Sequence, residues 1–117
     1  MDGYFYVFYL SGSYETEFVM EVARSSDLIE WQKSPLNPVM RPSDEDRKIA
    51  NPSLSSAERV RAATDKNINN SDPDFCEWKG QLIFYYCWGD QTAKGLHLAK
   101  AVYDGTSEQF IEGWFPQ

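Results

Sequence analysis

Residues 69–75 (NNSDPDF) are the segment of this sequence whose residue types best suit chemistry. Two amides and two carboxylates come just before an apolar stretch, and Pro73 favours an extended backbone at the beginning of a strand. If the strand is the innermost of a sheet around a channel, Asn70 and Asp74 are candidate substrate-binding residues. Strand alternation predicts that Asp72 and Asp74 share one face. The alternative is an Asx-type turn, in which these side chains bond only to the backbone.

Trp88, His97 and the two cysteines are the other residues with chemical potential. Trp88 ends an apolar strand and is a candidate for stacking on a sugar ring, with packing between blades as the alternative. His97, the only histidine, is expected to be a surface or inter-strand residue. A two-residue turn at 79–80 places Cys76 opposite Ile83 rather than Cys87. We therefore expect buried free thiols, and the spacing does not suit a zinc site.

These residues belong to an internal repeat. Residues 2–9 match residues 79–86, and both read as a turn with glycine in second place followed by an aromatic strand. Residues 19–25 match residues 95–101, which aligns Ala23 with Ala99, and both alternate as half-buried strands do. An Asp turn and then an aromatic residue, Trp31 or Phe110, follow each. Each copy therefore predicts strand, loop, strand, turn and short strand.

The repeat predicts an all-β fold with a short helical insertion. Residues 43–68 are polar and helix-compatible, and Ser55 and Glu58 have the spacing of a capping box. Without this insertion each unit is about 50 residues long, a plausible size for an antiparallel β-propeller blade. We expect one partial domain, an incomplete propeller. Residues 1–42 would be a blade that lacks its inner strand, and 69–117 would be a second blade; either the chain is truncated or it borrows a strand from a partner.

Composition excludes several classes of partner. The net charge of −7 argues against nucleic acid, which needs a basic surface. The longest apolar run, residues 82–88, is far shorter than the roughly 20 residues of a membrane span. The first residues are not a secretory signal; the localisation stays open, and a secreted or periplasmic parent protein is compatible with this sequence. Exposed sheet edges favour a homo-oligomer.

The motifs of the repeat resemble those of glycoside hydrolase families 43 and 32. Residues 71–75 with Gly80 and residues 84–86 are similar to the blade opening DPxxF…GxxYxxY of these families. Residues 23–31 are similar to the ARSxDLxxW pattern of their third and fourth blade strands. The resemblance covers most of the chain outside residues 43–68, and it implies a five-bladed β-propeller with an active-site funnel at one end of the axis.

This resemblance implies roles for two carboxylates. Asp72 falls on the aspartate of the motif, and would act as the base or tune the acid in an early blade, or bind sugar in a late one. The family's acid glutamate precedes a strand like residues 4–9, a place that lies before Met1. Glu15 is the nearest remaining candidate, with a loop charge as its alternative. Hydrolysis of a glycosidic bond needs two carboxylates on opposite sides of that bond.

The functional hypothesis is a fragment of a glycoside hydrolase-like protein that acts on polysaccharide or oligosaccharide. The alternatives are a non-catalytic carbohydrate-binding module and a purely structural propeller module. A carbohydrate is the expected ligand. No cofactor is expected, and nothing in the sequence supports the structural calcium ion that some relatives carry on the axis.

Overall fold

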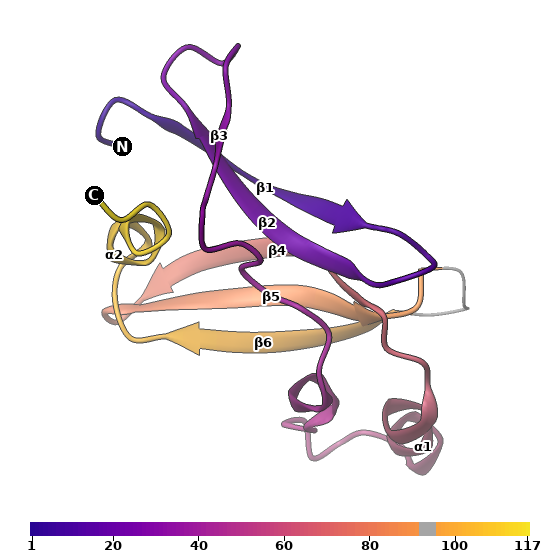
Figure 1. Ribbon diagram of the computed structural model, residues 1–117. Helices are drawn as coiled ribbons and strands as arrows, with labels where there is room; N and C mark the ends of the chain where they lie inside the picture. The colour runs from indigo at the N-terminus through magenta and orange to yellow at the C-terminus, as the bar shows by residue number, and fades with distance from the viewer. Residues whose placement is uncertain (92–95) are drawn as a thin grey trace.

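The computed structural model describes residues 1–91 and 96–117, and it consists mainly of β-sheet (Figure 1). A six-stranded mixed sheet, which is not closed, runs in the order β1-β2-β4-β5-β6, with β3 paired to β2. This confirms the all-β prediction with a short helical insertion. The elements in chain order are β1 Phe5–Gly12, β2 Phe18–Ser25, β3 Gln32–Lys33, the 3-10 helix η1 Asp44–Arg47, α1 Ser56–Thr64, β4 Asn69–Trp78, β5 Gln81–Gly89, β6 His97–Tyr103 and α2 Ser107–Glu112.

Two antiparallel units make up this sheet. The hairpin β1–β2, with β3 on the other side of β2, forms the first unit, and the meander β4–β5–β6 forms the second. The units meet where Phe18 of β2 pairs in parallel with Asn69 of β4, the one residue pair that joins these two strands. The hairpin then folds over the meander, so that the units also form two layers (Figure 1).

The repeat is visible in the backbone geometry. Asp2 and Gly3 before β1 have φ of 52° and 76°, and Lys79 and Gly80 before β5 have φ of 49° and 77°. Positive φ at both central residues is the type I′ geometry that matches the twist of a hairpin. Glycine suits such φ angles at no steric cost. The predicted turn at 79–80 is confirmed, and a second turn of the same type begins the first unit.

The strand pairing corrects the alignment of the two copies. Phe5 pairs with Ser25 in the first unit, as Leu82 pairs with Tyr103 in the second. Counting along both strands from these pairs matches Ala23 with Ala101 instead of Ala99. A shift of two residues keeps every side chain on its predicted face. Gly95, which begins the predicted second match, lies outside the described residues.

The core lies between the two layers. Met20 of β2, Tyr86 and Trp88 of β5, and Ala62 of α1 form its buried cluster. Beside this cluster, Phe8 of β1 contacts a set of aromatic rings from the second unit and α2, with centroids 5.4–6.5 Å away: Phe75, Phe84 and Phe110. Aromatic pairs at such separations add to the stabilisation that burial alone provides.

The predicted last strand of the second copy is wrong. Residues 107–112 form the helix α2, because Thr106 and Gln109 make a capping box in which the Thr106 side chain accepts a hydrogen bond from the Gln109 backbone. The helix buries Ile111, while the Phe110 ring packs against Phe84 and Phe8. The corresponding strand of the first copy, β3, has only two residues.

The helical insertion follows the prediction in its main feature. Ser55 caps α1, and its side chain accepts from the Glu58 backbone while the Glu58 carboxylate accepts from the Ser55 N–H. In Figure 1 the chain from β3 crosses in front of β5 and β6 before it reaches η1 and α1. In the described part of the chain, no helix is long and apolar enough to cross a membrane.

The cysteines agree with the prediction in pairing and differ in burial. Cys76 pairs with Ile83 across β4 and β5, and both thiols are free. Cys76 is exposed and Cys87 is half-buried, so the prediction of two buried thiols is wrong. Phe75 packs on Phe8 of the first unit, so strand alternation points the neighbouring Cys76 to the opposite face of β4. Burial raises the pKa of the Cys87 thiol, and the nearby charge of Asp72 adds to this effect.

Candidate functional site

A buried carboxylate, Asp46 of η1, ties the insertion to the sheet. Its Oδ1 accepts a hydrogen bond from the Tyr86 hydroxyl at 2.7 Å, and its Oδ2 accepts from Asn67 Nδ2 at 2.8 Å and Asn70 Nδ2 at 3.0 Å. The backbone N–H of Ser43 also donates to Oδ2, at 3.1 Å. These four donors compensate the carboxylate for the loss of water. Burial, and then the hydrogen bond to Asp46, raise the pKa of Tyr86 well above its usual range.

The amides at the beginning of β4 are part of this buried network. Asn70 is 1 % exposed; its Nδ2 also donates to the Asn69 carbonyl, and its Oδ1 has no hydrogen-bond partner. Asn69 Nδ2 donates to Ser71 Oγ at 2.8 Å, and Asn69 Oδ1 accepts from Gln91 Nε2 at 2.8 Å. The structure therefore places the predicted ligand Asn70 inside the protein, where it holds η1 against the sheet.

The two predicted carboxylates of β4 lie on either side of a bulge. Asp72 is exposed, has φ of 52°, and accepts a hydrogen bond from Ser71 Oγ at 3.1 Å. The pairing of β4 with β5 shifts between Ser71 and Asp74. Regular alternation does not hold across a bulge, so alternation does not place Asp72 and Asp74 on one face. Asp74 is exposed and pairs with Tyr85, whose side chain points away from the first unit.

Glu15 lies in the connection between β1 and β2 and is exposed. This connection is at the end of the sheet where β4 begins, because the Phe18 N–H donates to the Ile68 carbonyl at 2.7 Å. Glu15 and Asp72 therefore share one end of the sheet. No contact between the two side chains brings them into a pair.

Trp88 is buried, with two side chains against its indole. The ring is 2 % exposed and stacks on His97 with centroids 4.2 Å apart and an interplanar angle of 15°. The guanidinium of Arg47 lies over the ring at 5.3 Å from its centroid, within the range of a cation–π contact. Trp88 therefore packs inside the protein, and its ring is closed to a sugar in this arrangement.

The side chains around Trp88 line a pocket of about 480 Å³ between the insertion and the edge of the sheet at β6. His97 Nε2 lies 2.8 Å from Asp65 Oδ2, and Arg61 Nε lies 3.6 Å from the same oxygen. Cationic and anionic groups both line the pocket, together with aliphatic side chains. Its lining residues include Asp46, Arg47, Asn51, Leu54, Glu58, Arg61, Trp88, Leu96 and His97.

No family model, curated protein or solved structure matches this chain. The resemblance to glycoside hydrolase families 43 and 32 is therefore an expectation from sequence motifs alone.

Sequence reasoning missed most of this pocket. His97 is expected from the sequence to be a surface or inter-strand residue, and its contact with Asp65 has no local signal because the two are 32 positions apart. Asp46 and Tyr86 are 40 positions apart, so no local spacing links them. A carboxylate inside a charged insertion looks like a solvated side chain, and only the fold shows that it is buried.

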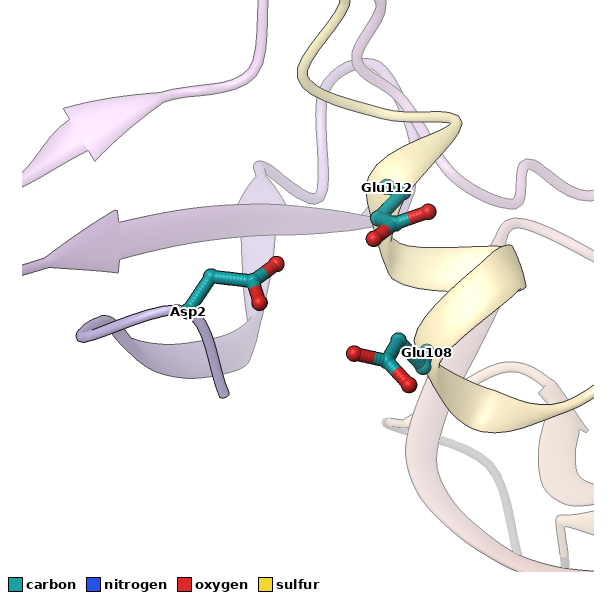
Figure 2. A group of neighbouring side chains, drawn as sticks. All are labelled: Asp2, Glu108 and Glu112. Atoms are coloured by element: carbon teal, nitrogen blue, oxygen red, sulfur yellow. The ribbon is translucent and has the colours of Figure 1, made fainter.

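Three carboxylates gather at the opposite end of the molecule (Figure 2). Oxygen atoms of Asp2, Glu108 and Glu112 all lie within 4.8 Å of one another, and all three residues are exposed. Carboxylate oxygens are the ligands that Ca²⁺ prefers, yet exposed acidic side chains often gather without an ion. Asp2 and Glu112 also line a second pocket, of about 610 Å³. The guanidinium of Arg24, another lining residue, lies over two aromatic rings there, those of Tyr4 and Phe115.

Proposed function

We propose that this chain is the carbohydrate-binding part of a glycoside hydrolase-like protein, and that it holds a neutral sugar in the pocket between the insertion and β6. The observation that carries the proposal is the chemistry of the pocket wall, where charged planar groups of both signs stand beside aliphatic side chains. Its volume of about 480 Å³ lies within the range of small-molecule sites, roughly 300–1,000 Å³.

The polar groups of the pocket suit hydroxyl groups. Arg47 and Arg61 provide N–H donors, and the Glu58 carboxylate and the Asn51 amide provide acceptors. A sugar hydroxyl donates and accepts at once, so it needs both kinds of partner. Because the basic side chains of Arg47, Lys48 and Arg61 stand beside the acidic side chains of Asp46 and Glu58, we expect a neutral ligand rather than a phosphate or a polyanion.

The arrangement of carboxylates favours binding over turnover by this chain alone. Glycoside hydrolysis uses two carboxyl groups about 5–9.5 Å apart that flank the bond. Asp46, the buried carboxylate of the pocket, already accepts hydrogen bonds at both oxygens. Asp72 and Glu15, the carboxylates that the family motifs suggest, are both exposed and make no pair.

Titration with neutral oligosaccharides tests the proposal. We expect saturable NMR shifts of the Trp88 indole and His97 imidazole signals with at least one member of a panel of plant and fungal oligosaccharides. Arg61→Ala removes a pocket donor and should weaken binding about tenfold, as the loss of a charge-assisted hydrogen bond does. Arg41→Ala is the matched control, since Arg41 is exposed outside the pocket and pairs with Glu17. Absence of shifts at millimolar sugar would refute the proposal.

Glycoside hydrolysis by the parent protein is a second proposal, and it rests on Asp72. A non-glycine residue with φ of 52° is strained, although Asp tolerates this region better than most. Such strain gathers at functional sites, and Ser71 fixes the carboxylate. Asp72→Asn should abolish turnover of aryl-glycosides by a protein that contains this chain, while sugar binding in the pocket persists. Unchanged turnover would remove Asp72 from the mechanism.

A further inference from the structure

Equivalent faces of the two hairpins differ in burial: the face that one hairpin buries is exposed in the other. We call β1–β2 the first hairpin and β5–β6 the second hairpin. Within each, the face that points into the core between the layers is the inner face, and the opposite face is the outer face. The pairs Phe5–Ser25 and Leu82–Tyr103 are equivalent, so each residue of the first hairpin has a counterpart in the second.

Residues on the inner face of the first hairpin have counterparts on the outer face of the second. Phe8 packs on Phe75 and Phe84, and its counterpart is Tyr85, which is exposed. Met20 is 1 % exposed, and its counterpart Leu98 is 70 % exposed. The face that the first hairpin buries is therefore open in the second. Its exposed apolar members are Tyr85, Leu98 and Val102, and Trp78 of the adjoining β4 extends the surface. The exposed Lys100, which pairs with Tyr85, lies on the same face.

The reverse holds for the other pair of faces. Phe84, on the inner face of the second hairpin, is 4 % exposed, and its counterpart Val7, on the outer face of the first, is 39 % exposed. Phe5, the counterpart of the buried Leu82, is exposed as well. On this same outer face Ala23 and Ser25 of β2 are buried, so its open part is the β1 strip of Phe5 and Val7. This strip is the counterpart of Leu82 and Phe84, which the chain buries in its own core.

We propose that a second copy of this chain docks the outer face of its first hairpin on the outer face of the second hairpin. The chain itself provides the evidence, because the equivalent surfaces form its own core. Contiguous exposed apolar side chains mark interaction surfaces. The contact is head-to-tail, and such a contact produces rings if its rotation closes and filaments if it does not. It joins faces, whereas pairing of sheet edges would join the backbones of β1 and β6.

Three Val→Glu variants test the proposal with the same change of charge. Val7→Glu alters the outer face of the first hairpin, and Val102→Glu alters that of the second. Val60→Glu is the control, because Val60 is exposed on α1, outside both faces. Sedimentation velocity over a range of concentrations should show the wild type and Val60→Glu above the chain mass of 13.5 kDa. Each face variant should associate about tenfold more weakly or worse, as happens when a charge enters an apolar contact. Unfolding curves check that each variant is folded.

Mixing the two face variants gives the decisive result. Each variant keeps the face that the other has lost, so an equimolar mixture should form a dimer that neither variant forms alone, and the dimer should not grow further. A symmetric contact between two second hairpins would instead be lost in Val102→Glu, unchanged in Val7→Glu and not rescued by mixing. That pattern, or a wild type that stays monomeric at millimolar concentration, would overturn the proposal.

Discussion

Asp46 is the residue on which the insertion depends. Its two oxygens accept hydrogen bonds from Tyr86, Asn67, Asn70 and the Ser43 backbone, and they link η1 to β4, β5 and the segment before β4. An interior carboxylate is stabilising only while such donors surround it, and the donors in turn need the carboxylate. The network thus fixes one wall of the candidate sugar pocket.

Removal of this carboxylate should cost more stability than any surface change in the insertion. Asp46→Ala leaves buried donors of Tyr86 and Asn70 without an acceptor, and we expect a loss of about 3 kcal/mol in the free energy of unfolding. Urea denaturation measures the loss. Asp44→Ala is the control, because Asp44 is exposed and makes only a 3.6 Å ion pair with Arg47. Equal losses in the two variants would contradict the assigned role of Asp46.

Asp27 makes stability depend on pH. The backbone N–H groups of Glu30 and Ile29, and then the Ser25 hydroxyl, lower the pKa of Asp27 below its ordinary value of 3.8. A lowered folded-state pKa means that the unfolded chain binds more protons in this range. The stabilisation is therefore present above pH 3.8 and is lost as the pH falls through the lower, folded-state value.

Thermal unfolding between pH 2 and pH 6 tests this dependence. The wild type should lose more of its melting temperature on acidification than Asp27→Asn, whose side chain does not ionise. Glu30→Gln is the control, since the Glu30 side chain is exposed and only its backbone bonds to Asp27. Parallel curves for wild type and Asp27→Asn would show that the turn at residues 25–30 has no part in acid stability.

At the scale of the elements, a glycine at the equivalent position ends the first strand of each hairpin. Gly12 ends β1 with φ of 120°, and Gly89 ends β5 with φ of 129°. A side chain is strained at either position. Their surroundings differ, because a Cβ at residue 12 would lie 1.9 Å from the Glu17 carbonyl oxygen, whereas one at residue 89 would meet only ordinary contacts.

This matched pair predicts unequal costs for one substitution. Gly89→Ala should destabilise by about 1–2 kcal/mol through backbone strain alone. Gly12→Ala must also move the backbone of the β1–β2 connection, and we expect a loss of more than about 3 kcal/mol. Urea midpoints of the two variants give the comparison, and an equal loss would show that the Glu17 carbonyl moves away freely.

Elements with a local signal were predictable, and those that depend on tertiary contacts were not. The turn at 79–80 and the capping box of Ser55 and Glu58 follow from nearby residues, and both were confirmed. Phe110 suggested a strand, yet residues 107–112 form α2. The local signal that indicates this helix is the capping box of Thr106 and Gln109, which was not part of the prediction. The pocket could not be predicted, since His97 and Asp65 meet only when the insertion folds onto β6.

At the scale of the whole molecule, local stability differs between the elements. β5 lies between β4 and β6 and buries four of its side chains, whereas α1 buries Ala62 alone. Segments with little buried apolar surface open more easily than the strands of a core. Hydrogen exchange should therefore protect amides of β5 about a hundredfold more than those of α1.

A bound sugar should reduce the difference in hydrogen exchange between α1 and β5. Because the pocket lies between α1 and the sheet, a ligand that bridges them should slow exchange in α1 and leave β5 unchanged. Similar protection of α1 and β5 without ligand would contradict the uneven stability. Slowing of exchange throughout the chain would place the ligand elsewhere.

The single parallel pair between Phe18 and Asn69 indicates the order in which the parts of the sheet form during folding. Hairpin β1–β2 and meander β4–β6 each join neighbours in sequence, so their loops close early and at little entropic cost. The pair between Phe18 and Asn69 forms later, because it closes a loop that contains the whole insertion. We therefore expect each unit to form first and the two units to pack together late in folding. Substitutions in the turns should change the folding rate, and substitutions at Phe8 should change the unfolding rate.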